Sequence, residues 1–142
     1  MRIVREPSLT VPGPPENFTG PVWADTIATP GRASRLILQT VRFAPGSRTM
    51  WHAHPLGQVI LITDGAGLVQ RRDGPVEKVR DGDTVVFEPG EWHWHGADPE
   101  SFMSHIAVQE VDAEATPPNA ACTSPTPTIW LSRRQSFVRD AI

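Results

Sequence analysis

Prolines and glycines are spread along almost the whole chain and constrain its fold more than any other feature. The sequence has 15 prolines and 11 glycines in 142 residues, so few stretches are long enough for an uninterrupted helix. The segments between them are short, and many are rich in apolar and β-branched residues, as strands are. Short strands and turn residues at this spacing predict an all-β barrel or sandwich.

The expected strands end at recognisable turn sequences. Residues 58–63 (QVILIT) stop at Asp64-Gly65, and residues 67–72 (GLVQRR) stop at Asp73-Gly74. Asp-Gly pairs are favoured in tight hairpin turns, so two hairpins are expected here. No internal repeat is found, which favours one β domain over an array. The remaining expected strands are residues 35–43, 76–79, 84–87 and 104–111.

The chain is long enough for one domain with a full core, which we place at residues 1–142 with the barrel at about 18–111. Residues 113–128 are rich in Pro, Ala and Thr and are predicted to be a linker-like tract. Residues 129–142 are predicted to form a short C-terminal helix that covers one end of the barrel, with Ser132 as its cap.

Composition argues against several classes of partner. The net charge is −3 and no basic run is present, so we expect no nucleic-acid partner. No apolar run is long enough to span a bilayer, and the N-terminus lacks the apolar region of a secretory signal. We therefore expect no membrane partner and a cytoplasmic location. The single cysteine, Cys122, allows no intrachain disulfide.

The five histidines are concentrated between residues 52 and 105, and four of them form two His-x-His pairs. Because strand side chains alternate, His52 and His54 share one face, as do His93 and His95, while His105 lies in a third segment. A single strand histidine is usually a hydrogen-bonded surface or core residue. Two same-face pairs in one β domain favour a metal site, since neutral imidazole is a common metal ligand.

These residues resemble the two sequence motifs of the cupin family. The first motif is matched by residues 46–65 (GSRTMWHAHPLGQVILITDG), with Gln58 in place of the usual glutamate. The second is matched by residues 82–93 (GDTVVFEPGEWH), with its proline displaced by one position. The resemblance implies an all-β cupin double-stranded β-helix, a jelly-roll barrel.

By the same resemblance, four residues are expected to bind metal: His52, His54, Gln58 and His93. One divalent ion per chain is implied, with manganese preferred and iron, nickel or zinc using the same ligand types. Three neutral imidazoles and a neutral amide leave the full charge of the ion uncompensated. Such a site should be a stronger Lewis acid than one that contains a carboxylate.

The resemblance is most specific to small bacterial cupins that include manganese-dependent hydroxynitrile lyases. It covers roughly Phe18 to Val111 and includes the stretches FTGPV, PGEWHWHGA and SHIAVQE. Those lyases also use glutamine as the fourth ligand, and His95, His105 and Gln109 match their pocket residues. The implied reaction cleaves a cyanohydrin to an aldehyde and cyanide. His105 or His95 would be the general base, and Gln109 would orient this small-molecule substrate.

Other interpretations remain open at this stage. A metal-dependent cupin dioxygenase or oxidoreductase could act on a small aromatic or enol substrate, and a non-enzymatic cupin could bind a metal or small molecule. His95 and His105 could instead only position the ligands. Gln39 lies where the lyases carry a small residue, so it could narrow or repolarise the pocket.

The tryptophans between the expected ligands give a further expectation. Trp51, Trp92 and Trp94 alternate with the histidines and should point away from the site, packing between sheets or at a subunit interface. Cupins commonly pair through β-sheet edges, so the resemblance implies a homodimer or homotetramer.

Overall fold

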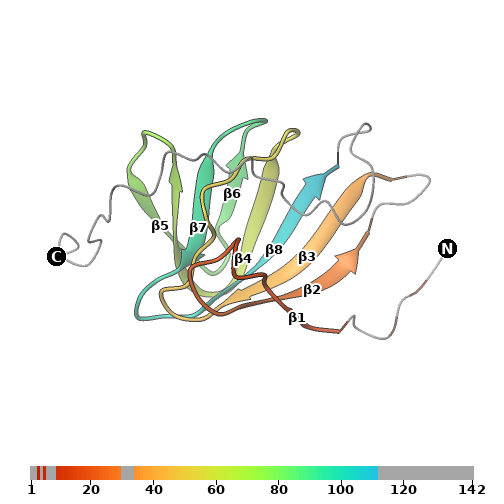
Figure 1. Cartoon of the computed structure of the whole chain (residues 1–142), viewed down its shortest axis with the longest axis horizontal. Helices are drawn as coiled ribbons and strands as arrows, with labels where there is room; N and C mark the ends of the chain where they lie inside the picture. The colour runs from red at the N-terminus through yellow and green to blue at the C-terminus, as the bar shows by residue number, and fades with distance from the viewer. Residues whose placement is uncertain (1–2, 4, 6–8, 30–33, 112–142) are drawn as a thin grey trace.

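The computed structural model describes residues 3, 5, 9–29 and 34–111, and within them the fold is all-β (Figure 1). Its described part has no helix, and therefore none that could span a membrane. The predicted linker at 113–128 and the predicted helix at 129–142 lie outside the described residues. The strands are β1 (Val11–Pro12), β2 (Val22–Ala28), β3 (Leu36–Phe43), β4 (Gln58–Arg71), β5 (Val76–Arg80), β6 (Thr84–Phe87), β7 (His93–Ala97) and β8 (Met103–Glu110).

The strands form two antiparallel sheets that share β4. The large sheet runs β1, β2, β3, β8, the first half of β4, and β6. The small sheet consists of β5, the second half of β4, and β7. Figure 1 shows the two sheets curving toward each other, with β5 and β7 on one side and β2 and β3 on the other. This is the predicted barrel-like architecture.

The prediction of a hairpin at Asp64-Gly65 is wrong. Strand β4 continues through this pair, and its register with β8 shifts between Ile62 and Asp64. Gly65 has a positive φ of 76°, and a Cβ there would collide with the Phe102 carbonyl oxygen. The glycine therefore serves a bulge that bends β4 from the large sheet into the small one.

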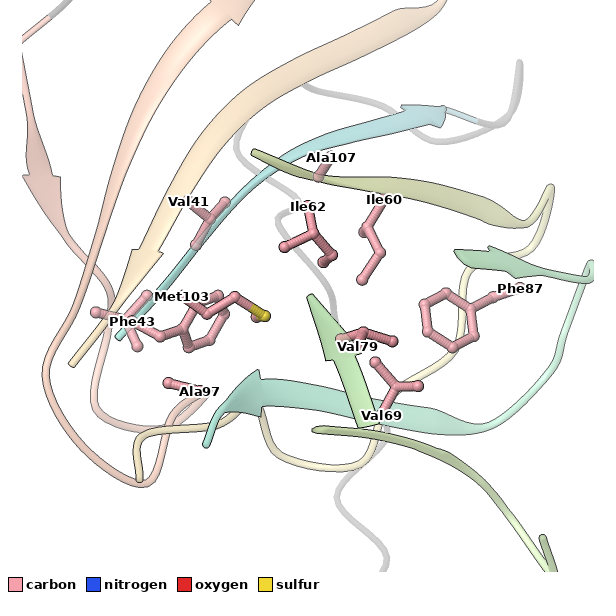
Figure 2. Packing of buried hydrophobic residues seen from close by; sticks show 11 residues of the cluster. Val41, Phe43, Ile60, Ile62, Val69, Val79, Phe87, Ala97, Met103 and Ala107 are labelled. Carbon is pink, nitrogen blue, oxygen red and sulfur yellow. The ribbon is translucent and has the colours of Figure 1, made fainter. Parts of the chain in front are cut away.

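The core fills the space between the inner faces of the two sheets (Figure 2). Alternation along β4 turns Ile60 and Ile62 inward, where they are 0% and 1% exposed, and leaves Leu61 between them on the outer face. Figure 2 shows these isoleucines facing Val69 and Val79 of the small sheet. The full buried cluster is Val22, Val41, Phe43, Ile60, Ile62, Val69, Val79, Phe87, Ala97, Met103 and Ala107.

Candidate metal centre

The segment before the first histidine pair runs antiparallel to β7, which brings the two pairs together. The backbones of His52 and His93 exchange hydrogen bonds of 3.0 and 2.9 Å, and the Thr49 N–H donates to the His95 carbonyl at 2.9 Å. Gly96 permits this approach, because a Cβ at that position would collide with the Ser47 carbonyl and with Arg48. Two His-x-His pairs whose first histidines, His52 and His93, are 41 positions apart thus meet through paired backbone segments.

Hydrogen bonds to the backbone orient the rings of His52 and His93. Nδ1 of His52 lies 2.9 Å from the Met50 carbonyl oxygen, and Nδ1 of His93 lies 2.8 Å from that of Glu91. A carbonyl can only accept, so each Nδ1 must carry the proton, which leaves Nε2 with a free lone pair. Metal-binding histidines are commonly fixed by this kind of bond.

Gln58 presents its amide oxygen to the same point. Its Nε2 donates to Oε1 of Gln109 at 2.8 Å, and its Oε1 lies 3.2 Å from Nε2 of His93. With the His93 proton on Nδ1, both atoms of this second contact carry lone pairs and neither can donate. A cation next to both atoms would remove this mismatch, so the donor set fits a metal ion.

Burial keeps these imidazoles neutral, as metal ligands must be. Burial, with a smaller contribution from the neighbouring His52, lowers the pKa of His93 to about 3 and that of His54 to about 4. The His54 ring lies 5.0 Å from the His52 ring, and its buried Nε2 has no hydrogen-bond partner in the described structure. A buried nitrogen with a free lone pair is costly unless it binds something.

His95 lies closer to this centre than the sequence predicts for a pocket residue. One ring nitrogen from each of His52, His93 and His95 lies within 4.8 Å of the others, and these three buried histidines could hold a metal ion. Both ring nitrogens of His95 are buried without a partner, and burial lowers its pKa well below the ordinary value. The predicted set of His52, His54, Gln58 and His93 stays a prediction, with His95 as a competitor for His54.

The other predicted pocket residues lie beside the histidine cluster. The His105 ring is 4.9 Å from that of His95 and 5.5 Å from that of Phe43. Burial lowers the pKa of His105 to about 4. Gln109 is paired in register with Gln58 across β8 and β4, which explains the bond between their side chains.

Phe87 is a site residue that the sequence interpretation missed. Its ring stacks on that of His93 at 3.6 Å between centroids with an interplanar angle of 6°. Phe87 is the last residue of β6 and is paired in register with Gln58. Both residues contact the His93 ring, Phe87 through its ring and Gln58 through its Oε1. The available signal was a large aromatic residue inside the second cupin motif, six positions before His93.

A cavity of about 640 Å³ opens onto the cluster. His52, His54, Gln58, His95, His105 and Gln109 line it, and so do apolar residues of β2, β3 and β8 such as Ala24, Val41 and Ala107. The N-terminal residues 11–14, 16 and 17 form another part of the wall, which no sequence pattern indicated. Gln39 is also on the wall, as expected from its place in β3.

The expectation for the tryptophans is only partly right. Trp94 is 5% exposed and is not among the residues that line the cavity. Its Nε1 donates to Oε1 of Gln70 at 2.8 Å, and Arg48 stacks on its ring. Trp51 and Trp92, by contrast, border the cavity. Trp51 lies in a bend before β4 and Trp92 precedes β7, so strict strand alternation does not hold at either position.

Comparison with known proteins agrees with this geometry. The model of the cupin domain matches residues 39–106, which include both histidine pairs. A protein of Granulicella tundricola named (R)-mandelonitrile lyase is 47% identical over 98 residues, which are 69% of this chain and 75% of that protein. The chain belongs to the cupin family. The matched domain begins at Gln39 and ends at Ile106, within the barrel described above.

Solved cupin structures share the fold of this cupin. A cupin-like protein from Thermotoga maritima superimposes with a TM-score of 0.68 at 34% identity, covering 77% of this chain and 81% of its own. A cupin 2 conserved barrel domain protein from Rhodopseudomonas palustris gives a TM-score of 0.64 at 16% identity, covering 73% and 72%. The second likeness concerns the fold alone.

Proposed function

We propose that this cupin is a metal-dependent lyase that cleaves a cyanohydrin to an aldehyde and cyanide. The observation that carries the proposal is a buried group of donors that opens onto a cavity: one ring nitrogen from each of His52, His93 and His95 lies within 4.8 Å of the others, and Oε1 of Gln58 lies 3.2 Å from His93. The 47% identical relative named (R)-mandelonitrile lyase supports the same reaction class.

His52, His54, Gln58 and His93 would hold the metal, for which we prefer manganese. When bound, it would supply Lewis acidity that lowers the pKa of a substrate hydroxyl and favours the departing anion. The donor set is uncharged, because burial lowers the pKa of His52, His54 and His93 and because Gln58 is an amide. The chain itself therefore adds no negative charge that would weaken this effect.

His105 is the proposed general base. Burial lowers its pKa to about 4, so its neutral form predominates at neutral pH, and it lines the cavity. Its ring would take the hydroxyl proton as the C–O bond becomes a carbonyl and the electron pair of the C–C bond leaves with cyanide. Because burial disfavours its charged form, the protonated ring readily returns the proton to cyanide, giving hydrogen cyanide and restoring the neutral histidine.

Gln109 is the proposed orienting residue. Its Oε1 is engaged by the Gln58 amide, so its conformation is tied to a predicted metal ligand. Its position on the cavity wall allows it to hold a polar group of the substrate beside that ligand. The apolar residues Ala24, Val41 and Ala107 would then accept the aldehyde's hydrocarbon part.

The reaction is tested by aldehyde release from racemic mandelonitrile. The manganese-loaded protein should produce benzaldehyde at mildly acidic pH, where the background reaction is slow, and a His52→Ala variant should not. Equal rates for the two proteins would remove the lyase proposal. Oxygen uptake with an enol or small aromatic substrate would then favour the dioxygenase alternative.

Replacement of His105 by alanine should lower kcat by about 10²- to 10⁴-fold, the usual contribution of a general base. Metal content should stay at the wild-type level, because His105 is not one of the predicted ligands. The matched variant is His95→Ala, which removes the neighbouring cavity histidine. A larger loss of kcat in His95→Ala at unchanged metal content would assign the base to His95 instead.

A further inference from the structure

Gln39 places an amide on the cavity wall between short side chains. It lies on β3 and lines the cavity together with Val41, which follows on the same face of the strand. Its neighbours in register are Thr26 on β2 and Ala107 on β8, and both of them also line the cavity. Because these neighbours have short side chains, they leave the longer side chain of Gln39 open to a ligand in the cavity.

The side-chain amide of Gln39 makes no hydrogen bond within the described part of the chain. A glutamine amide offers both an acceptor oxygen and an NH₂ donor. An apolar ligand that covered this amide would remove its water without giving it a new partner, which is unfavourable. A hydroxyl group at the same point can donate to Oε1 of Gln39 or accept from its Nε2. The wall therefore favours a ligand that is polar at this end.

A second amide with an unused donor lies near Gln39. Because Gln39 is paired with Ala107, Gln109 is its diagonal neighbour on β8, at roughly 7–8 Å between Cα atoms. Oε1 of Gln109 accepts the hydrogen bond from Gln58, and its Nε2 has no partner among the residues that the structure describes. One hydroxyl group placed between Gln39 and Gln109 can therefore interact with both amides.

The distance from the predicted metal ligands indicates the size of this ligand. Gln58 on β4 and Gln39 on β3 lie on either side of β8, so their backbones are at least two strand spacings apart, roughly 10 Å. A short aliphatic substrate held at the metal does not extend that far. A benzene ring with a hydroxyl substituent does, and Val41 and Phe43 give such a ring an apolar wall.

We propose that Gln39 forms a polar subsite that selects aromatic substrates with a hydroxyl group on the ring, remote from the reacting carbon. This inference rests on the proposed function, because it concerns the ring of the cyanohydrin whose other end lies at the metal. Gln39 binds the substrate at this substituent only and takes no part in breaking the C–C bond. Cyanohydrins of hydroxybenzaldehydes are then preferred over mandelonitrile, whose ring carries no polar group.

Binding of the product aldehydes tests the subsite without any turnover. Isothermal titration calorimetry on the manganese-loaded full chain compares benzaldehyde with meta- and para-hydroxybenzaldehyde. The wild type should bind at least one hydroxylated aldehyde about 10-fold more tightly than benzaldehyde, the usual effect of a hydrogen bond to an otherwise unpaired amide. Gln39→Met keeps the length of the side chain and removes the amide, so this preference should disappear. Thr40→Val is the matched control: Thr40 follows Gln39 in β3 but does not line the cavity, so the preference should remain.

Two results would overturn the subsite. One is a wild type that binds benzaldehyde as tightly as both hydroxylated aldehydes. The other is a preference that Gln39→Met retains, which would mean that the hydroxyl group is held elsewhere, for instance at the metal. If Gln39→Met does not fold by circular dichroism, Gln39→Leu is read in its place.

The mandelonitrile assay separates this inference from the proposed reaction. Release of benzaldehyde from mandelonitrile, combined with equal binding of all three aldehydes, would remove the subsite and keep the lyase. A binding preference that depends on Gln39, without release of aldehyde from any cyanohydrin, would support the subsite and remove the lyase.

Discussion

Replacement of His93 by alanine should abolish stoichiometric metal binding. His93 is 0% exposed, its Nδ1 is held by the Glu91 carbonyl, and its Nε2 faces the Gln58 amide oxygen at 3.2 Å. It belongs both to the four predicted ligands and to the three-histidine group of the structure. The loss should therefore be complete whichever of the two sets binds the ion.

Metal content after extensive dialysis, measured by elemental analysis, checks this expectation. The matched control is His105→Ala, the same change at another fully buried histidine of the cavity, which should retain one ion per chain. Unchanged metal content in His93→Ala would refute both ligand sets.

Two further variants decide between the sets. With the predicted ligands, His54→Ala should lose most of the metal and His95→Ala should keep it. With the three-histidine group, the order should be reversed, because His95 and not His54 then completes the site. Metal binding depends on each ligand strongly enough for elemental analysis to separate these outcomes.

Much of the barrel was predictable because its strands carry local signals. The segments at β3 and β8 were predicted to within one residue, since each is rich in apolar residues and is bounded by turn residues. Strand β2 was not predicted, because Asp25 and the small Ala24 weaken its apolar pattern. Its position is set by pairing with β3, including the Asp25–Arg42 ion pair. Pairing with a strand that is distant in the sequence cannot be recognised from the residues of β2 alone.

The histidine cluster was predictable for a related reason, and its surroundings were not. Strand alternation alone places His93 and His95 on one face, and the motif spacing implies that His52 lies near them. The continuous path of β4 through Asp64-Gly65 depends on the contact of Gly65 with Phe102 from another segment. The wall formed by residues 11–14, 16 and 17 is likewise a tertiary feature, since nothing in that stretch indicates which cavity it would border.

The metal-free protein should become markedly less stable as the pH falls from 7.5 to 5. An unfolded chain protonates its histidines near their ordinary pKa of about 6.5. The folded chain does not, because burial lowers the pKa of His54 and His105 to about 4 and that of His93 to about 3. Between pH 7.5 and 5 the unfolded state binds more protons than the folded state, so the free energy of unfolding decreases as the pH decreases.

Each of these three histidines should contribute about 2 kcal/mol to the loss between pH 7.5 and 5, since one pH unit corresponds to about 1.4 kcal/mol per proton. A total on the order of 6 kcal/mol is a large part of the stability of an ordinary domain. Below the folded pKa values the native protein also takes up protons, so the decline should level off near pH 3.

Urea unfolding of the chelator-treated protein at a series of pH values measures this slope. His105→Gln removes one titrating group and keeps a polar side chain, so its stability should fall by about 2 kcal/mol less over the same interval. A wild-type stability that is flat from pH 7.5 to 5 would mean that the folded histidines titrate near their ordinary pKa. In that case the cluster would be open to water and would not be the enclosed, neutral donor set described above.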